Sequence, residues 1–295
     1  MVRKNDSHFK KRCSMSLFKK FFTIFSFFSL CLAANSKEEE ERSAKKALFE
    51  AGLFGGAVQF SLYPGSGEYG TRTLLFPYLF YRGKIFRSDR RGTRARIYKK
   101  DDWTFGLGFG GNIGSRSSES SIREGMPELD LVFEIGPRVR KFNLFKNKNL
   151  ELGFSLKKAN LFKGIKLYSQ GYTLQGSLSL RRPFEMWGKN IFFTRLSFKL
   201  ADELYQDYFY TVPKAYEKPG RPAYQAKGGV LGMRYFAGLQ KPIFKGKWIN
   251  FFGITLQEYS LAANKNSPLH THDLTYNLIY GFRVGLYESK SRGYE

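Results

Sequence analysis

The last regular stretch of the chain, residues 274–286, alternates large apolar residues with polar or small ones. The apolar positions are Leu274, Tyr276, Leu278, Tyr280, Phe282, Val284 and Leu286. Side chains of a β-strand alternate between its two faces, so this pattern predicts a strand with one apolar face. Its length of roughly 40 Å, tilted by about 45°, spans just under 30 Å, which is typical of a strand that crosses a membrane.

The same alternation recurs along the chain and predicts twelve strands. We expect them near 51–62, 72–82, 84–90, 93–99, 102–114, 128–141, 147–158, 170–182, 190–203, 224–241, 248–260 and 273–286. The fold class is therefore all-β, a transmembrane antiparallel up-and-down β-barrel. The stretch 84–99 is short and basic, and ten strands is the alternative count.

The connections between these strands alternate in length. Segments near 63–71, 115–127, 159–169, 204–223 and 261–272 are long, whereas those at 83, 100–101, 142–146, 183–189 and 242–247 are short. Long external loops and short periplasmic turns are typical of bacterial outer-membrane barrels. Only the link at Arg91 and Gly92 is short where a long one is expected.

The N-terminal segment predicts export. Basic residues precede an apolar run from Phe21 to Leu32, and small residues follow, so residues 1–34 are expected to be a signal peptide, with Met15 as a second candidate start. Cys13 and Cys31 both lie within it, and simple cleavage is favoured over lipid anchoring at Cys31. We expect a charged lead-in over 35–50, the barrel over 51–287 and a short tail over 288–295.

The charge balance is strongly basic. The chain carries a net charge of +24, and without residues 1–34 it keeps 42 Lys and Arg against 24 Asp and Glu, a net charge of +18. The electrostatic field of so large a positive charge favours anionic partners. In an exported protein with scattered charges, outer-membrane lipids and lipopolysaccharide are the expected partners, and nucleic acid is not.

Several short blocks resemble the MipA/OmpV family of outer-membrane proteins. They are Pro77–Gly83, Gly125–Asp130, Glu134–Pro137, Tyr205–Phe209, Val212–Pro213, Gly220–Gly229 and Asn266–Leu269. The chain departs from the family in the longer Phe209–Val212 block and in continuing past Phe282. The resemblance implies a barrel in the outer membrane of a diderm bacterium and a scaffolding role for murein-remodelling proteins.

Charged residues at the inward positions of the predicted strands form a candidate lumen network. They are Asp130, Glu134, Arg138, Arg140, Arg181, Arg195, Lys199, Arg234 and Arg283. One interpretation is a neutralising network that fills a narrow barrel, because buried polar groups need partners. The other is a constriction that favours anions, because bases outnumber acids.

Two further sets are expected on the external side. An external basic rim consists of Arg87, Arg90, Arg91, Arg94 and Arg96, suited to lipid phosphates. An external aromatic loop contains Tyr205, Tyr208, Phe209, Tyr210 and Tyr216. It is interpreted either as part of an interfacial aromatic girdle or as a proline-braced platform for a partner.

The sequence favours a non-enzymatic protein. His270 and His272 stand close together in a loop, but no oxyanion-hole signal accompanies them, and catalysis or metal binding there is not expected. No cofactor is expected. The leading hypothesis is a monomeric structural or scaffolding barrel of the cell envelope; the alternatives are a small-solute pore and a lipid-modifying enzyme.

Overall fold

A computed structural model describes residues 48–82, 86–89, 92–163, 166–184, 190–244 and 247–291, and no side chains from 82 to 100. The chain divides into two units after Lys46, and all of the described residues belong to the unit that begins at Ala47. The expected signal peptide and most of the expected lead-in lie outside the described residues. Phe49 and Glu50, at the end of that lead-in, belong to the first strand.

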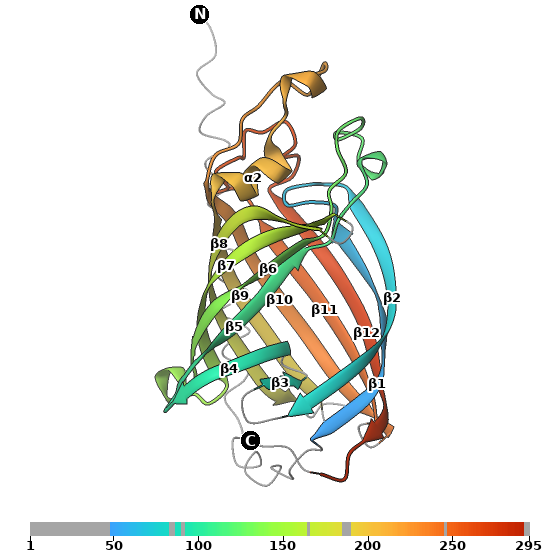
Figure 1. The fold of residues 1–295 in the computed structure, drawn as a ribbon, viewed down its shortest axis with the longest axis vertical. Helices are drawn as coiled ribbons and strands as arrows, with labels where there is room; N and C mark the ends of the chain where they lie inside the picture. The colour runs from blue at the N-terminus through green and yellow to red at the C-terminus, as the bar shows by residue number, and fades with distance from the viewer. Residues whose placement is uncertain are drawn as a thin grey trace, which may run out of the picture. The chain divides into compact units, whose positions relative to one another are not determined.

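The described chain forms a closed antiparallel β-barrel of twelve strands (Figure 1). The strands are β1 (Phe49–Ser61), β2 (Tyr69–Arg82), β3 (Phe86–Asp89), β4 (Gly92–Lys100), β5 (Trp103–Asn112), β6 (Val132–Lys141), β7 (Leu150–Lys163), β8 (Lys166–Phe184), β9 (Asn190–Ala201), β10 (Gly229–Ile243), β11 (Trp248–Glu258) and β12 (Leu274–Glu288). Consecutive strands are neighbours, and β12 pairs with β1, from Glu50↔Glu288 to Gln59↔Leu278, to close the wall.

The all-β prediction and the count of twelve are confirmed, while several boundaries move. β7 continues to Lys163 and β8 begins at Lys166, so the long loop expected over 159–169 is wrong. The two strands pair as far as Lys163↔Lys166, because alternation continues past the predicted ends. β10 starts at Gly229, five residues later than expected, because the segment before it packs above the barrel.

One end of the barrel carries the strand ends near both termini, and we call it the terminal end. The other, the loop end, carries four segments that we call the cap: 62–68, 113–131, 202–228 and 259–273. The cap contains α2 (Glu203–Tyr210) and short 3₁₀ helices over Ser117–Glu119 and Lys214–Tyr216; a third, Leu144–Lys146, lies in a turn at the terminal end. Figure 1 shows α2 above the strands.

The cap has its own apolar core. Its fully buried side chains include Leu62, Tyr63, Phe209, Tyr210 and Leu269, which come from three of the four cap segments. Burial of several large side chains of this kind stabilises a structure by roughly 1.5–3 kcal/mol for each one. The loop end is therefore closed by a packed layer rather than by separate loops.

No helix in the described part of the chain is both long enough and apolar enough to cross a membrane.

Candidate functional site: a capped basic lumen

The two faces of the barrel wall differ as the alternation predicts. On β12, Leu278 and Tyr280 are exposed on the outside, whereas Thr275 and Arg283 are buried on the inside. Other exposed large apolar side chains on the outer face are Leu53, Leu75, Leu79, Phe154, Leu156, Leu174 and Phe252. The outer face is therefore suited to hydrocarbon and the lumen to polar groups.

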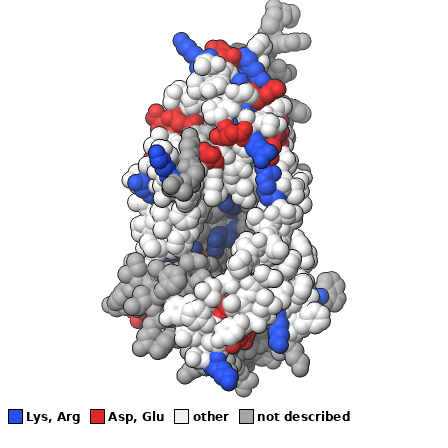
Figure 2. Space-filling view, turned by 45° about the vertical axis from the view of Figure 1, so that its right-hand side comes forward, with Lys and Arg blue, Asp and Glu red and all other residues white. Residues whose placement is uncertain are grey.

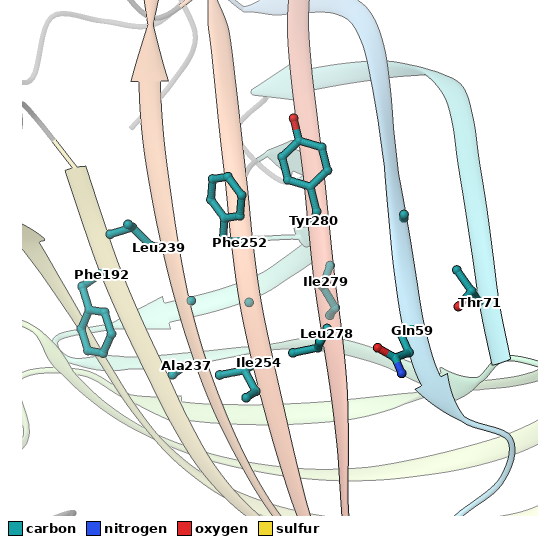
Figure 3. A pocket seen from close by; sticks show the side chains of 13 residues that line it. Gln59, Thr71, Phe192, Ala237, Leu239, Phe252, Ile254, Leu278, Ile279 and Tyr280 are labelled. Carbon is teal, nitrogen blue, oxygen red and sulfur yellow. The ribbon is translucent and has the colours of Figure 1, made fainter. Parts of the chain in front are cut away.

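A shallow depression of about 660 Å³ lies on the outer face of the wall between β9 and β2 (Figure 3). Leu239, Phe252, Leu278 and Tyr280 line it, and small residues such as Ala237 leave the space between them. Its lining is mostly apolar, with Gln59 and Thr71 near one edge. The depression belongs to the apolar outer wall and offers few polar groups to a ligand.

Inside the barrel, Glu134 on β6 is the centre of a buried cluster. Its carboxylate is fully buried and accepts hydrogen bonds from Lys157 Nζ at 2.7 Å, Lys199 Nζ at 2.5 Å, Tyr205 OH at 3.0 Å and Thr173 Oγ1 at 3.2 Å. The four donors come from β7, β9, α2 and β8. One carboxylate thus joins three further strands of the wall to the helix of the cap.

The glycines of β5 make room for this cluster. A side chain at Gly110 would place its Cβ 2.6 Å from Lys157 Nζ and 2.8 Å from the Glu134 carboxylate. Gly108 is similarly close to the Arg138 side chain, at 3.2 Å. The alternating glycines of this strand therefore leave the space that the charged side chains of β6 and β7 occupy.

A second group of charges lies further toward the terminal end. Arg138 and Arg140 are 3.3 and 3.4 Å from the carboxylate oxygens of Glu151. Arg283 forms an ion pair with Glu50, and its guanidinium also lies 5.3 Å from the centre of the Tyr78 ring. Both carboxylates are therefore counter-charges for lumen arginines.

Two lumen arginines differ from the rest because they are exposed. Arg195 on β9 donates from Nε to Ser179 Oγ at 2.9 Å, and Arg234 on β10 donates from Nη2 to Gln257 Oε1 at 3.3 Å. Both partners are neutral. Among the described residues neither arginine has a carboxylate within ion-pair distance.

The structure thus brings most of the predicted lumen network together and corrects one member. Asp130 precedes β6 and lies in the cap, where its backbone N–H donates to the Tyr208 hydroxyl. The first residue of β6 is Val132, so the strand begins later than its alternation suggested. Arg181 lies on the lumen-facing register of β8, two residues beyond Ser179.

Sequence reasoning missed Lys157, Glu151, Glu50, Thr173 and Tyr205 as members of the lumen network. The first two have the same strand parity as their inward neighbours, so alternation alone could have found them. Glu50 was assigned to the lead-in. Tyr205 enters the lumen from a helix, and strand alternation carries no signal for that contact.

Of the two interpretations of the aromatic loop, the external platform is wrong. Residues 203–210 form α2, and Tyr205, Phe209 and Tyr210 are at most 1% exposed. Residues four apart on a helix, such as Tyr205 and Phe209, share one face, and here that face packs into the core of the cap. Tyr208 and Tyr216 are half-buried against the same core. The aromatic residues therefore close the barrel instead of presenting a surface.

The expected external basic rim is also misplaced. Arg87, Arg94 and Arg96 belong to β3 and β4, whose backbone lies near the terminal end in Figure 1. β3 has only four residues, so the hairpin that it forms with β4 does not reach the cap. Arg90 and Arg91 lie outside the described residues.

Two buried arginines of the cap join its segments. Arg221 donates to the carbonyl oxygens of Tyr216, Ile122 and Glu124 at 2.7–3.0 Å. Arg123 donates to the Phe209 carbonyl at 3.3 Å, and burial lowers its pKa. Each guanidinium thus supplies hydrogen bonds to carbonyl groups that packing has removed from water.

Burial also keeps the tyrosines of the cap neutral. The pKa of Tyr63 is raised to about 12, chiefly by burial, and burial raises the pKa of Tyr205 well above its usual value. The Tyr63 hydroxyl donates to the Leu269 carbonyl at 2.8 Å. These phenols act as hydrogen-bond donors and not as bases.

His270 and His272 lie in the cap segment before β12. His270 Nε2 is 3.0 Å from Asp273 Oδ1, and its ring packs near Tyr210 and Tyr259. Among the described residues no group of three or more His, Cys, Asp or Glu side chains is placed to hold a metal ion.

Comparison with solved structures finds a chain described as "Bacterial polysaccharide outer membrane secretin". It has 10% sequence identity and a TM-score of 0.35, with 83% of this chain and 99% of that chain covered. A search of curated proteins finds no significant match. The family model described as "MltA-interacting protein MipA" matches residues 53–284, nearly the whole barrel, and the chain therefore belongs to the MipA family.

Proposed function

We propose that this protein is an outer-membrane barrel that acts as a non-enzymatic scaffold and holds a murein-remodelling enzyme of the MltA type. The observation that carries the proposal is the family match over residues 53–284. Its description names an interaction with MltA. The apolar outer wall supports the membrane location, because large apolar side chains exposed on the outer face suit contact with hydrocarbon.

The packed cap supports a scaffolding role rather than the function of a pore. Its core closes the loop end, and the Glu134 cluster lies directly beneath α2. A solute would have to displace buried side chains to pass. We therefore expect no steady conductance when the refolded barrel is added to a planar bilayer, and stepwise channels would contradict this part of the proposal.

The terminal end offers two surfaces for an enzyme in the periplasm. Phe145 and Phe244 stand in separate turns at that end and are 87% and 73% exposed. Both have positive φ angles, 52° and 48°, which are uncommon for bulky residues. Lys146 and Lys247 lie beside them, so each turn combines an apolar anchor with positive charge.

The test is direct binding between the purified barrel in detergent and the MltA-type lytic transglycosylase of the same organism. We expect the double variant Phe145→Ser/Phe244→Ser to weaken binding at least tenfold, since exposed aromatic anchors carry much of the energy of an interface. Leu261→Ser, which changes a residue of the cap that is 63% exposed, is the matched control and should bind normally. No binding by the unchanged barrel would refute the scaffold.

A further inference from the structure

The barrel wall is incompletely paired between β2 and β5. β2 pairs with β1 from Tyr69 to Tyr81, but β3 pairs with it only at Tyr81 and Arg82. β5 pairs with β6 along its whole length, whereas β4 pairs with it only from Trp103 to Gly106. Within the described residues, the facing edges of β2 over 69–77 and of β5 over 107–112 therefore have no neighbouring strand.

These two edges bound an opening that we call the side window. Toward the loop end, Arg72 of β2 forms an ion pair with Glu119 at 2.7 Å, and Glu68 accepts a hydrogen bond from the Ser121 N–H at 2.8 Å. Toward the terminal end, β3 and β4 fill the wall (Figure 1). Figure 2 shows a hollow in the wall on this side, with Lys or Arg atoms at its base.

The exposed lumen arginines lie across the barrel from the side window. Around the wall, β9 is the fourth strand from β5, and β10 is the fourth strand from β2. Arg195 and Arg234 therefore project into the lumen from the far wall. The buried lumen cations are compensated by Glu50, Glu134 and Glu151, whereas these two have only neutral hydrogen-bond partners in the described structure.

The frame of the side window is apolar. Leu74, Leu75, Phe76 and Leu79 of β2 are exposed, and Leu75 is 70% exposed. Phe109 is exposed on β5. Inside the lumen, Arg195 and Arg234 are exposed cations that face the side window from the far wall. A ligand with acyl chains outside the barrel and a phosphate inside the lumen matches both features. Inorganic phosphate would make no apolar contact with the frame.

We propose that the side window admits the phosphate-bearing headgroup of a membrane lipid, which Arg195 and Arg234 bind in the lumen while its acyl chains remain outside. Guanidinium groups suit phosphate because they donate two parallel hydrogen bonds. This inference rests on the proposed outer-membrane location and adds a ligand to it. It requires no chemical step.

The test places a photo-crosslinking amino acid at one of two adjacent residues of β8 in the full chain. Ser179 faces the lumen beside Arg195, and Leu180 is its matched control on the outer face. Cells grown with radioactive phosphate are irradiated, and the purified barrel is digested. The mass of each labelled peptide shows whether the adduct carries acyl chains.

We expect lipid adducts at both positions. The variant Arg195→Gln/Arg234→Gln should lower the Ser179 adduct about tenfold, because charge-assisted hydrogen bonds are lost, and leave the Leu180 adduct unchanged. Heat-modifiable mobility in gels verifies that the variant has assembled.

Four results would overturn the inference. Lipid at Leu180 without lipid at Ser179 would refute the side window and leave the membrane location intact. Lipid at neither position would refute the membrane location itself. A protein adduct at Ser179, or an unchanged lipid adduct in the double variant, would show that another chain or other residues occupy the lumen.

Discussion

Glu134 shows how one residue organises the lumen. It is a single carboxylate with two lysines, so the cluster keeps a net positive charge although it is buried. Two charges removed from water are tolerated only when the opposite charge and further hydrogen bonds are in place. Thr173 and Tyr205 supply those additional bonds. The residue therefore links the stability of the wall to the position of α2.

We predict that Glu134→Gln destabilises the barrel by about 3–5 kcal/mol, because it leaves Lys157 and Lys199 without their counter-charge. Urea unfolding in detergent micelles measures this. The matched control is Glu119→Gln, which breaks a partly exposed pair with Arg72 and should cost about 0–1 kcal/mol. Equal losses in the two variants would contradict the role given to Glu134.

At the scale of elements, α2 depends on the residue that precedes it. The Asp202 carboxylate accepts hydrogen bonds from the Tyr205 N–H and the Tyr172 N–H, both at 2.9 Å. It therefore caps the helix and joins it to β8. Gly171 is needed beside it, since its φ is +90° and a Cβ there would lie 2.1 Å from Asp202 Oδ1.

We predict that Asp202→Ala costs about 1 kcal/mol or more, because the helix loses its N-cap and a strand N–H loses its acceptor. The loss should appear as faster hydrogen exchange in residues 203–210. Glu203→Ala changes an exposed residue of the first turn and should leave exchange nearly unaltered. Similar exchange in both variants would argue against the capping role.

The contact between the cap segments 62–68 and 113–131 should depend on pH. Burial alone would raise the pKa of Glu68, but hydrogen bonds from Ser120 and Ser121 outweigh it and lower that pKa. A lowered pKa in the folded state stabilises the contact above the unfolded value of about 4.5, and this contribution is lost as the pH falls through the lowered value.

We therefore predict that residues 113–131 become more accessible to an acid-stable protease near pH 3 than at pH 7. In Glu68→Gln, accessibility should be high at both pH values, since an amide does not titrate. A segment that is equally protected at both values in the unchanged protein would contradict the prediction.

At the scale of the whole molecule, the two faces of the wall suit different surroundings, lipid outside and polar groups inside. Leu278 lies on the outer face of β12, and Ile279, the next residue, lies on the inner face, which it shares with Arg283. A charged residue facing hydrocarbon costs about 2–4 kcal/mol near the middle of a bilayer, whereas the lumen tolerates charge better.

We predict that Leu278→Arg sharply lowers the assembled fraction, whereas Ile279→Arg lowers it much less. Gel mobility with and without heating, after refolding into phospholipid bilayers, measures the assembled fraction. Equal effects at the two positions would mean that the outer face does not contact lipid.

The sequence by itself determined the wall. Alternation in strands such as 274–286 has a period of two, which sets both the face of each side chain and the number of strands, and so most of the lumen residues followed from parity. The short basic stretch 84–99 indicated only the existence of β3 and β4, because β3 has four residues and a strand that short carries little pattern.

Only the tertiary structure decided the cap and the contacts across the lumen. Tyr205 and Phe209 read as surface aromatics in a loop, yet α2 turns them into the core, because burial depends on what three distant segments place around them. The pairing of Glu134 with Lys157 and Lys199 likewise joins residues 23 and 65 positions apart. Such contacts depend on closure of the barrel, which no local pattern contains.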